Sequence, residues 1–254
     1  MDQALENSSD KQKPLVVLTF DDGDIGLFYH LLPLVQSERL PVTVYISTGQ
    51  IESGQPYWFD RIMNALQRPE KTIIDLTDHG LRSWLVGPET GVSRWAIISD
   101  ILETLKSISP SGRKVLVEKI IEQAGSAISG FTPIAPMSIK QLKSLAEDPL
   151  VTIGAHSHCH NLLNQIPLDQ ARASIQMSRT LLETWTDQEI RHFAYPNGSH
   201  TTELQAELAQ QGFISATVLD AELATLSMNR FALSRVGVGR YDTLNRFKLK
   251  LVKI

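Results

Sequence analysis

The sequence predicts an α/β protein with a parallel sheet, and three observations lead to this fold class. Apolar runs alternate with segments of helical periodicity near the start of the chain, and the alternation returns after Pro136. Residues 15–46 form a strand–helix–strand unit, and a connection of this kind joins parallel strands. The chain has 254 residues, of which 42% are hydrophobic. This is enough for a substantial core, so we expect residues 14–254 to form a single domain.

The strand–helix–strand unit consists of a strand over Leu15–Phe20, a helix over Ile25–Glu38 and a strand over Val42–Ile46. The first strand opens with an apolar run, which predicts that it is buried. The helix has apolar residues at helical spacing, namely Leu27, Leu31, Leu34 and Val35. Because α/β barrels build their sites at the carboxyl ends of strands, the residues directly after Phe20 are site candidates.

Residues 55–130 differ from the first part of the chain, because their patterns are helical and carry no site motif. We interpret them as a mostly helical insertion, broken by a short polar stretch around Thr72–Gly80. The expected helices are Trp58–Gln67, Ser93–Ser107 and Gly112–Ala124. Trp58, Trp84 and Trp95 could serve as platforms for sugar rings, but aromatic residues at helical spacing usually pack in a core.

After Pro136 the alternation of helices and strands resumes. Ser138 is expected to cap the first of these helices, and Gly212 is expected to end the last one. The expected helices are Ser138–Glu147, Leu168–Thr186 and Thr201–Gln211. The expected strands are Val151–Ala155, Ile190–Ala194, Phe213–Val218 and Leu233–Val238.

The composition argues against several classes of protein. The net charge is −4 and there is no long basic run, so a nucleic-acid partner is not expected. No stretch approaches the roughly 18 apolar residues that a membrane span requires. Residues 1–13 are polar, lack the apolar core of a signal peptide and are expected to be a disordered tail. As written, the chain is expected to be cytoplasmic, although an exported protein whose leader had been removed would show the same features.

Two adjacent carboxylates, Asp21 and Asp22, follow the first predicted strand within the sequence TFDDG. Each raises the pKa of the other unless a cation or hydrogen bonds hold them, so a strand end with this pair indicates a site. A surface Asp-Asp-Gly turn is the alternative explanation. Asp24 could assist a metal shell or bind sugar, although a solvent-exposed turn residue is the simpler interpretation.

The segment His156–His160 holds three histidines, the commonest metal ligand, directly after the strand that ends at Ala155. His156 and His160 would share one face of a helical turn, where both can bind one ion. With one Asp they form a set that leaves positions open for water and substrate. The alternatives are a surface histidine patch and an alternating strand. Cys159, the only cysteine, excludes an internal disulfide and is itself a candidate zinc ligand, although a shared helical face for the histidines would point it elsewhere.

Three segments together resemble the motifs of the polysaccharide deacetylase family, the NodB-homology enzymes of carbohydrate esterase family 4. Thr19–Gly23 is similar to its TFDDG motif, and His156–His160 is similar to its H-[ST]-x-x-H motif. Arg191–Gly198 resembles its R-x-F-R-P-P-Y-G motif in a looser F-A-Y-P form. The lead-in Pro136–Ser138 also agrees with the family pattern.

This resemblance implies a distorted (β/α) barrel and a metal-dependent hydrolase that removes N-acetyl groups from an N-acetylated sugar or polysaccharide. In the family, the first Asp of the pair is the catalytic base and the second is a metal ligand, which makes Asp21 the base. Asp22, His156 and His160 would hold a divalent metal ion, most often zinc. Asn197 would supply a backbone N–H to the oxyanion.

Two departures from the family pattern concern the catalytic base and the proton donor. The arginine that steadies the catalytic Asp aligns with Ala194. The late L-x-H motif, whose histidine is the general acid, aligns with Arg235, and a guanidinium is a poor proton donor near neutral pH. Arg235 could instead replace the missing arginine and orient Asp21. The acid would then be a water on the metal or one of three histidines, His158, His192 and His200.

Two other functions remain open at this point. One is hydrolysis of another amide, an imide or an O-acetyl ester on the same scaffold, which the missing late histidine makes credible. The other is a non-catalytic relative that binds carbohydrate or metal. The intact Asp21 argues against the second, because a binding protein has no need of the first carboxylate.

Overall fold

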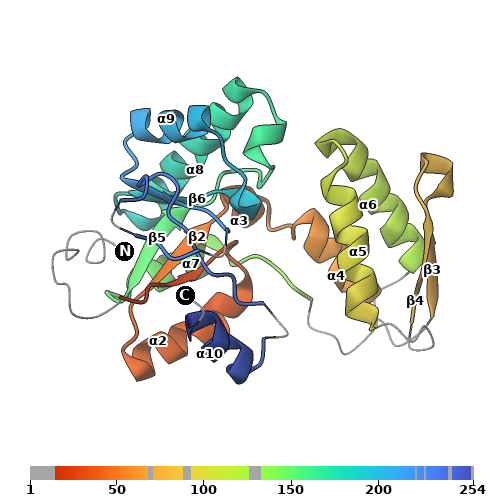
Figure 1. Ribbon diagram of the computed structural model, residues 1–254, viewed down its shortest axis with the longest axis horizontal. Helices are drawn as coiled ribbons and strands as arrows, with labels where there is room; N and C mark the ends of the chain where they lie inside the picture. Colours follow the sequence, from red (N-terminus) through yellow and green to blue (C-terminus); the bar gives the residue numbers. More distant parts are fainter. Residues whose placement is uncertain are drawn as a thin grey trace. The chain divides into compact units, whose positions relative to one another are not determined.

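The computed structural model describes residues 15–67, 71–87, 93–125, 133–220, 222–225, 227–239 and 242–252. The expected N-terminal tail, residues 1–13, lies outside them. The chain divides into two compact units (Figure 1): the first unit consists of residues 1–53 and 137–254, and the second unit of residues 54–136. None of the described helices is both long and apolar enough to cross a membrane.

The first unit is built on a five-stranded sheet in which every neighbouring pair of strands is parallel. In spatial order the strands are β1 (Leu18–Phe20), β2 (Val42–Ile46), β5 (Val151–Ala155), β6 (His192–Ala194) and β7 (Ser215–Thr217). The sheet forms a half-barrel, so the predicted α/β class and distorted barrel are confirmed. Because all five strands run in one direction, their last residues meet at one edge of the sheet, which we call the carboxyl edge.

Helices connect and cover the strands of the first unit (Figure 1). Ser138 caps one of them, α7, in a capping box that Gln141 completes, as predicted. Another, α8, buries Ile175 in the same hydrophobic core as Val44 and Phe193 of the sheet. The helices are a π-helix (Leu27–Leu31), α2 (Leu32–Glu38), α3 (Thr48–Ser53), α7 (Ile139–Ala146), α8 (Leu168–Thr186), α9 (Thr202–Gln210) and α10 (Leu244–Val252).

Two predicted strands of this unit, Ile190–Ala194 and Phe213–Val218, are shorter in the structure, where they are β6 and β7, and two others differ more. The strand expected over Leu15–Phe20 begins only at Leu18, and Leu15 is 63% exposed. The reason is that β1 is the edge strand, with β2 as its one neighbour, and an apolar run does not distinguish an edge strand from a central one. The strand expected over Leu233–Val238 is reduced to a single parallel bridge between Leu233 and Thr217.

The second unit has a hydrophobic core of its own. Its elements are α4 (Trp58–Leu66), β3 (Thr72–Asp75), β4 (Ser83–Val86), α5 (Arg94–Lys106) and α6 (Pro110–Ala124). The three predicted helices are confirmed, and the helices are interrupted around Thr72–Gly80 as expected, but the strand β3 that lies there and pairs antiparallel with β4 was not predicted. Ile74 explains the difference, since its fully buried side chain ties β3 to the core of this unit.

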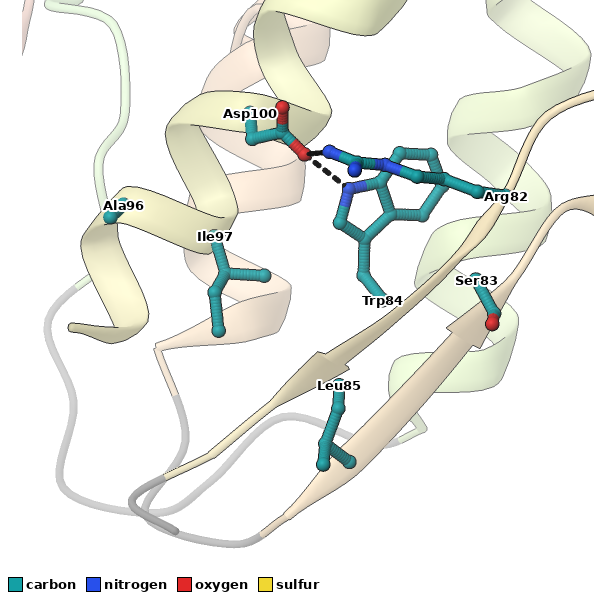
Figure 2. A pocket seen from close by; sticks show the side chains of 7 residues that line it. All are labelled: Arg82, Ser83, Trp84, Leu85, Ala96, Ile97 and Asp100. Carbon is teal, nitrogen blue, oxygen red and sulfur yellow. Dashed lines mark hydrogen bonds and ion pairs between the residues drawn. The ribbon is translucent and has the colours of Figure 1, made fainter. Parts of the chain in front are cut away.

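The tryptophans of the second unit pack in or against this core, as their spacing predicted. Figure 2 shows Trp84 beside a groove between β4 and α5, where its Nε1 donates a hydrogen bond of 2.6 Å to Asp100. The Arg82 guanidinium also pairs with Asp100 and lies 5.3 Å from the centre of the Trp84 ring. Since Trp84 is only 6% exposed, its ring offers no face for a sugar.

Candidate active site

The segment Asp21–Gly23 leaves β1 in a tight turn at the carboxyl edge. Asp22 has a φ of 80° and Gly23 a φ of 101°. A left-handed backbone of this kind costs a non-glycine residue of order 1–3 kcal/mol. The Ser47 N–H holds the turn by donating to the Asp22 carbonyl at 3.2 Å, and a Cβ at position 23 would come within 3.3 Å of Ile46. Strain that neighbouring residues maintain in this way is typical of functional sites.

The histidine segment begins where β5 ends. The His156 N–H donates to the Ile46 carbonyl at 2.9 Å, so His156 still follows the pairing of β5 with β2. The chain then forms a loop in which Ser157 has a φ of 63° and His160 a φ of 51°. The predicted helical turn is therefore wrong, but the predicted convergence is confirmed, because the two Nε2 atoms of His156 and His160 lie 3.2 Å apart.

Three donor atoms from these two segments form a nearly regular triangle. Asp22 Oδ1 lies 3.5 Å from His156 Nε2 and 3.1 Å from His160 Nε2, and the third side is the 3.2 Å between the two nitrogens. Ligands that bind a tetrahedral zinc ion at 2.0–2.2 Å lie about 3.3–3.6 Å from one another, so the triangle fits an ion of this size. This group can hold a divalent metal ion.

A backbone carbonyl holds His156 in the orientation that this role requires. The ring is 2% exposed, and its Nδ1 lies 2.7 Å from the carbonyl oxygen of Ala194 on β6. Because a carbonyl can only accept, Nδ1 carries a proton, and Nε2, on the side of Asp22, is the nitrogen that can offer its lone pair to an ion.

The charges of the group are strongly coupled. Burial raises the pKa of Asp22, but the charge of His160 and the hydrogen bonds from both histidines outweigh it, so this pKa lies well below its usual range. Burial lowers the pKa of His156, but its hydrogen bond to Asp22 and the charges of Asp21 and Asp22 outweigh that effect and raise it. A bound cation would stabilise the Asp22 carboxylate in place of the protons on the histidines.

Arg235 binds the other carboxylate of the pair in a bidentate ion pair. Its Nη1 lies 2.7 Å from Asp21 Oδ1 and its Nη2 lies 2.8 Å from Oδ2, while Nη1 also reaches the Thr19 hydroxyl at 3.1 Å. The Arg235 side chain is 11% exposed and that of Asp21 is 25% exposed. Burial lowers the pKa of Arg235, but the hydrogen bonds and charge of Asp21 raise it above its ordinary value. The contact expected between Arg235 and Asp21 is present, and this guanidinium is not a proton donor.

The other candidate residues lie at or near the same edge. Asn197 follows β6 in an exposed turn and has a φ of 56°. Asp24 accepts a hydrogen bond from the Gly26 N–H at 2.6 Å and is not part of the metal-ligand group, which supports the turn interpretation. Cys159 also lies outside that group, with its Sγ 3.3 Å from the hydroxyl of Ser174.

The three candidate proton donors differ in exposure. His192 is 1% exposed and its Nδ1 lies 2.8 Å from the Ser215 hydroxyl of the neighbouring strand, so it cannot reach a substrate. His158 is partly exposed, with Nδ1 2.9 Å from the Thr48 hydroxyl. His200 is exposed, and its Nδ1 lies 3.1 Å from the Gly198 carbonyl.

Sequence reasoning missed the residues that hold the histidine loop. Ser47 and Gly49 follow β2 at the carboxyl edge, and this position was the one feature of the sequence that could have marked them as site residues. Ser174 lies inside α8, where nothing in the sequence separates it from other helical serines. The Ala194 carbonyl is a backbone group and has no sequence signature.

The chain is similar to a known protein family and to solved structures. The chain matches the polysaccharide deacetylase family over residues 8–215. No curated protein matches it.

Solved structures share its fold at low sequence identity. A deacetylase of Streptococcus pyogenes in complex with acetate, PplD, aligns with 14% identity and a TM-score of 0.61 over 98% of this chain and 76% of that one. IcaB from Ammonifex degensii aligns with 16% identity and a TM-score of 0.55 over 98% and 78% of the two chains. A de-N-acetylase from Aggregatibacter actinomycetemcomitans aligns with 12% identity and a TM-score of 0.56 over 98% and 79%.

Proposed function

We propose that this chain, which belongs to the polysaccharide deacetylase family, is a metal-dependent hydrolase that removes N-acetyl groups from an N-acetylated sugar or polysaccharide. The observation that carries the proposal is the triangle of Asp22, His156 and His160, in which Asp22 directly follows Asp21 in the chain. The three ligands leave positions open for water and substrate, as catalytic rather than structural metal sites do. We propose zinc as the ion, because two imidazoles and one carboxylate suit it.

When bound, the ion supplies a Lewis acid that polarises the acetyl carbonyl and lowers the pKa of water toward neutrality. Asp21 is the general base, and it accepts a proton from the water that attacks this carbonyl. Arg235 binds both oxygens of Asp21, so that the carboxylate is held in one orientation. The Asn197 N–H donates to the oxyanion that forms.

The products are acetate and a free amine. The carbon–nitrogen bond breaks as a proton reaches the leaving nitrogen, and without that proton the amine is a very poor leaving group. His158 and His200 have the exposure that this donor needs, whereas His192 does not. Single His158→Gln and His200→Gln variants with full zinc content would separate the two, because the donor's variant loses turnover.

One observation favours a second candidate function. Arg235, at the position of the family's proton-donating histidine, is committed to Asp21. An O-acetyl ester releases an oxygen leaving group, which needs less help from a proton donor than a nitrogen does. Hydrolysis of an O-acetylated sugar is therefore the alternative that this observation favours. Hydrolysis of another amide or of an imide is the other alternative.

The test measures acetate release from N-acetylated and O-acetylated glycans, and ring opening of cyclic imides, by the zinc-loaded protein. The proposal expects the N-acetylated glycans to be the best substrates. Release from O-acetylated glycans or hydrolysis of imides in their place would support the alternative. Glycan binding with no hydrolysis at saturating zinc would indicate a non-catalytic relative.

A further inference from the structure

The loop between the two histidine ligands is held in a conformation that it would not adopt alone. Ser157 and His160 both have left-handed backbones, which residues with side chains disfavour. Within the loop, the His160 N–H donates to the Ser157 hydroxyl at 3.1 Å, which is a short-range bond. Contacts from outside must therefore keep the rings of His156 and His160 on one ion.

One of these contacts comes from α8. The hydroxyl oxygen of Ser174 accepts hydrogen bonds from the N–H of His158 at 3.0 Å and from the N–H of Cys159 at 3.4 Å. Ser174 is 6% exposed, and the neighbouring Ile175 is fully buried in the core. The loop is thus tied to a rigid part of the fold and not to another loop.

The second contact comes from the junction of β2 and α3, and it binds the carbonyl of the same residue, His158. The His158 carbonyl accepts from the Gly49 N–H at 2.8 Å and from the Ser47 hydroxyl at 3.2 Å. A Cβ at position 49 would lie 2.5 Å from that carbonyl oxygen, so only glycine allows the approach. His158 is therefore held at its N–H by one element and at its C=O by another.

We propose that Ser174 and Ser47 are positioning residues of the metal centre, which hold the loop so that His156 and His160 reach the ion together. They touch neither the ligand atoms nor a substrate, and they act through the backbone of His158. This inference rests on the proposed function only in so far as the histidines bind a metal ion. Outer-shell groups of this kind are worth roughly 10–100-fold in metal affinity.

The chain offers a matched control for Ser174. Ser178 lies one turn further along α8 and is also buried, but its hydroxyl makes no hydrogen bond within the described part of the chain. Replacing either serine with alanine removes the same atoms from the same helix. If the serines serve only to pack the helix, the zinc affinity of both variants would change alike. If Ser174 positions the loop, only Ser174→Ala would bind zinc more weakly.

The experiment measures zinc affinity by chelator competition, and the thermal stability of the zinc-free protein, for four chains. These are the unaltered chain, Ser174→Ala, Ser178→Ala and Ser47→Ala. We expect Ser174→Ala to bind zinc roughly 10–100-fold more weakly. Ser47→Ala should bind several-fold more weakly, because the Gly49 N–H still holds the His158 carbonyl, and Ser178→Ala should bind like the unaltered chain.

Equal zinc affinity in Ser174→Ala and Ser178→Ala would overturn the inference while leaving the proposed function intact. Should Ser174→Ala fail to fold, Ser47→Ala decides: an affinity equal to that of Ser178→Ala contradicts the positioning role. If the unaltered chain itself binds no zinc, the proposed metal function and this inference are both wrong.

Discussion

The backbone of non-glycine residues is strained at the carboxyl edge of the first unit, but not in the described residues of the second unit. Six non-glycine residues in the described part of the chain have a positive φ, and all six lie in the first unit. Two of them, Arg39 and Asp187, end helices, where this conformation is common. The other four are at the candidate site, namely Asp22, Ser157, His160 and Asn197.

The polar contacts of the two regions differ in the same way. In the second unit, ion pairs such as Arg61–Glu118 and Lys119–Asp78 have largely exposed carboxylates, and surface pairs of this kind contribute little to stability. At the carboxyl edge, His156 is buried and the Arg235 side chain is 11% exposed, and both are paired with partly exposed carboxylates. The difference teaches that backbone strain gathers where the chemistry is proposed, while the described residues of the second unit follow ordinary packing rules.

The largest expected effect is the loss of a ligand. His160→Ala should lose zinc and turnover together, with zinc affinity falling by more than about 100-fold, since even outer-shell groups are worth 10–100-fold. His79→Ala, in the second unit, is the control and should keep both. Zinc content of the purified variants and acetate release measure the effect. Full zinc content in His160→Ala would show that the first unit's histidine loop is not the metal site.

Next in size is the proposed base. Asp21→Asn should keep its zinc but lose about 10²–10⁴-fold in turnover, because the amide cannot accept the proton from water. Asp78→Asn, which removes an exposed carboxylate paired with Lys119, should change neither property. Acetate release from zinc-loaded proteins separates them. Retained turnover in Asp21→Asn would assign the base to another group.

A smaller effect is expected from the bidentate arginine. Arg235→Lys keeps the charge but cannot hold both oxygens of Asp21, and misplacement of a catalytic group by about 1 Å can cost 10²-fold in rate. We expect kcat to fall by that order with KM unchanged, and Arg82→Lys in the second unit to leave both constants unchanged. A rise in KM alone for Arg235→Lys would indicate a substrate contact and not orientation of the base.

The smallest expected effect concerns the second unit and tests whether a change in its packing leaves the metal site unaffected. Trp84→Phe removes the donor to Asp100 and should lower the free energy of unfolding by about 0.5–1.5 kcal/mol. Zinc affinity should stay the same, because nothing in the metal-ligand group comes from this unit. Denaturant unfolding and chelator competition measure the two quantities. Weaker zinc binding in Trp84→Phe would show that the two regions do not behave independently.

The pattern of apolar residues was sufficient to predict the helices and strands that pack in the hydrophobic core. The bounds of β2, β5 and α8 agree with the expected ones residue for residue, because each carries a continuous or periodic apolar pattern. The strand β3 was missed because its one fully buried residue, Ile74, follows an exposed isoleucine, Ile73, and the four residues show no alternation of apolar and polar side chains.

The ligand residues were predictable from their types and order, but the way they converge was not. The spacing of His156 and His160 indicated a helical turn, whereas left-handed backbones and external hydrogen bonds produce the contact. Those bonds come from Ser174 and from the Ala194 carbonyl, which are distant in sequence and leave no local pattern.

The central claim is that one carboxylate and two imidazoles bind a single ion. Anomalous diffraction at the zinc edge from crystals of the zinc-loaded protein tests it most directly. The account predicts one peak within about 2.0–2.2 Å of Asp22 Oδ1 and of the Nε2 atoms of His156 and His160. A zinc ion bound elsewhere, with these three side chains uncoordinated, would contradict it.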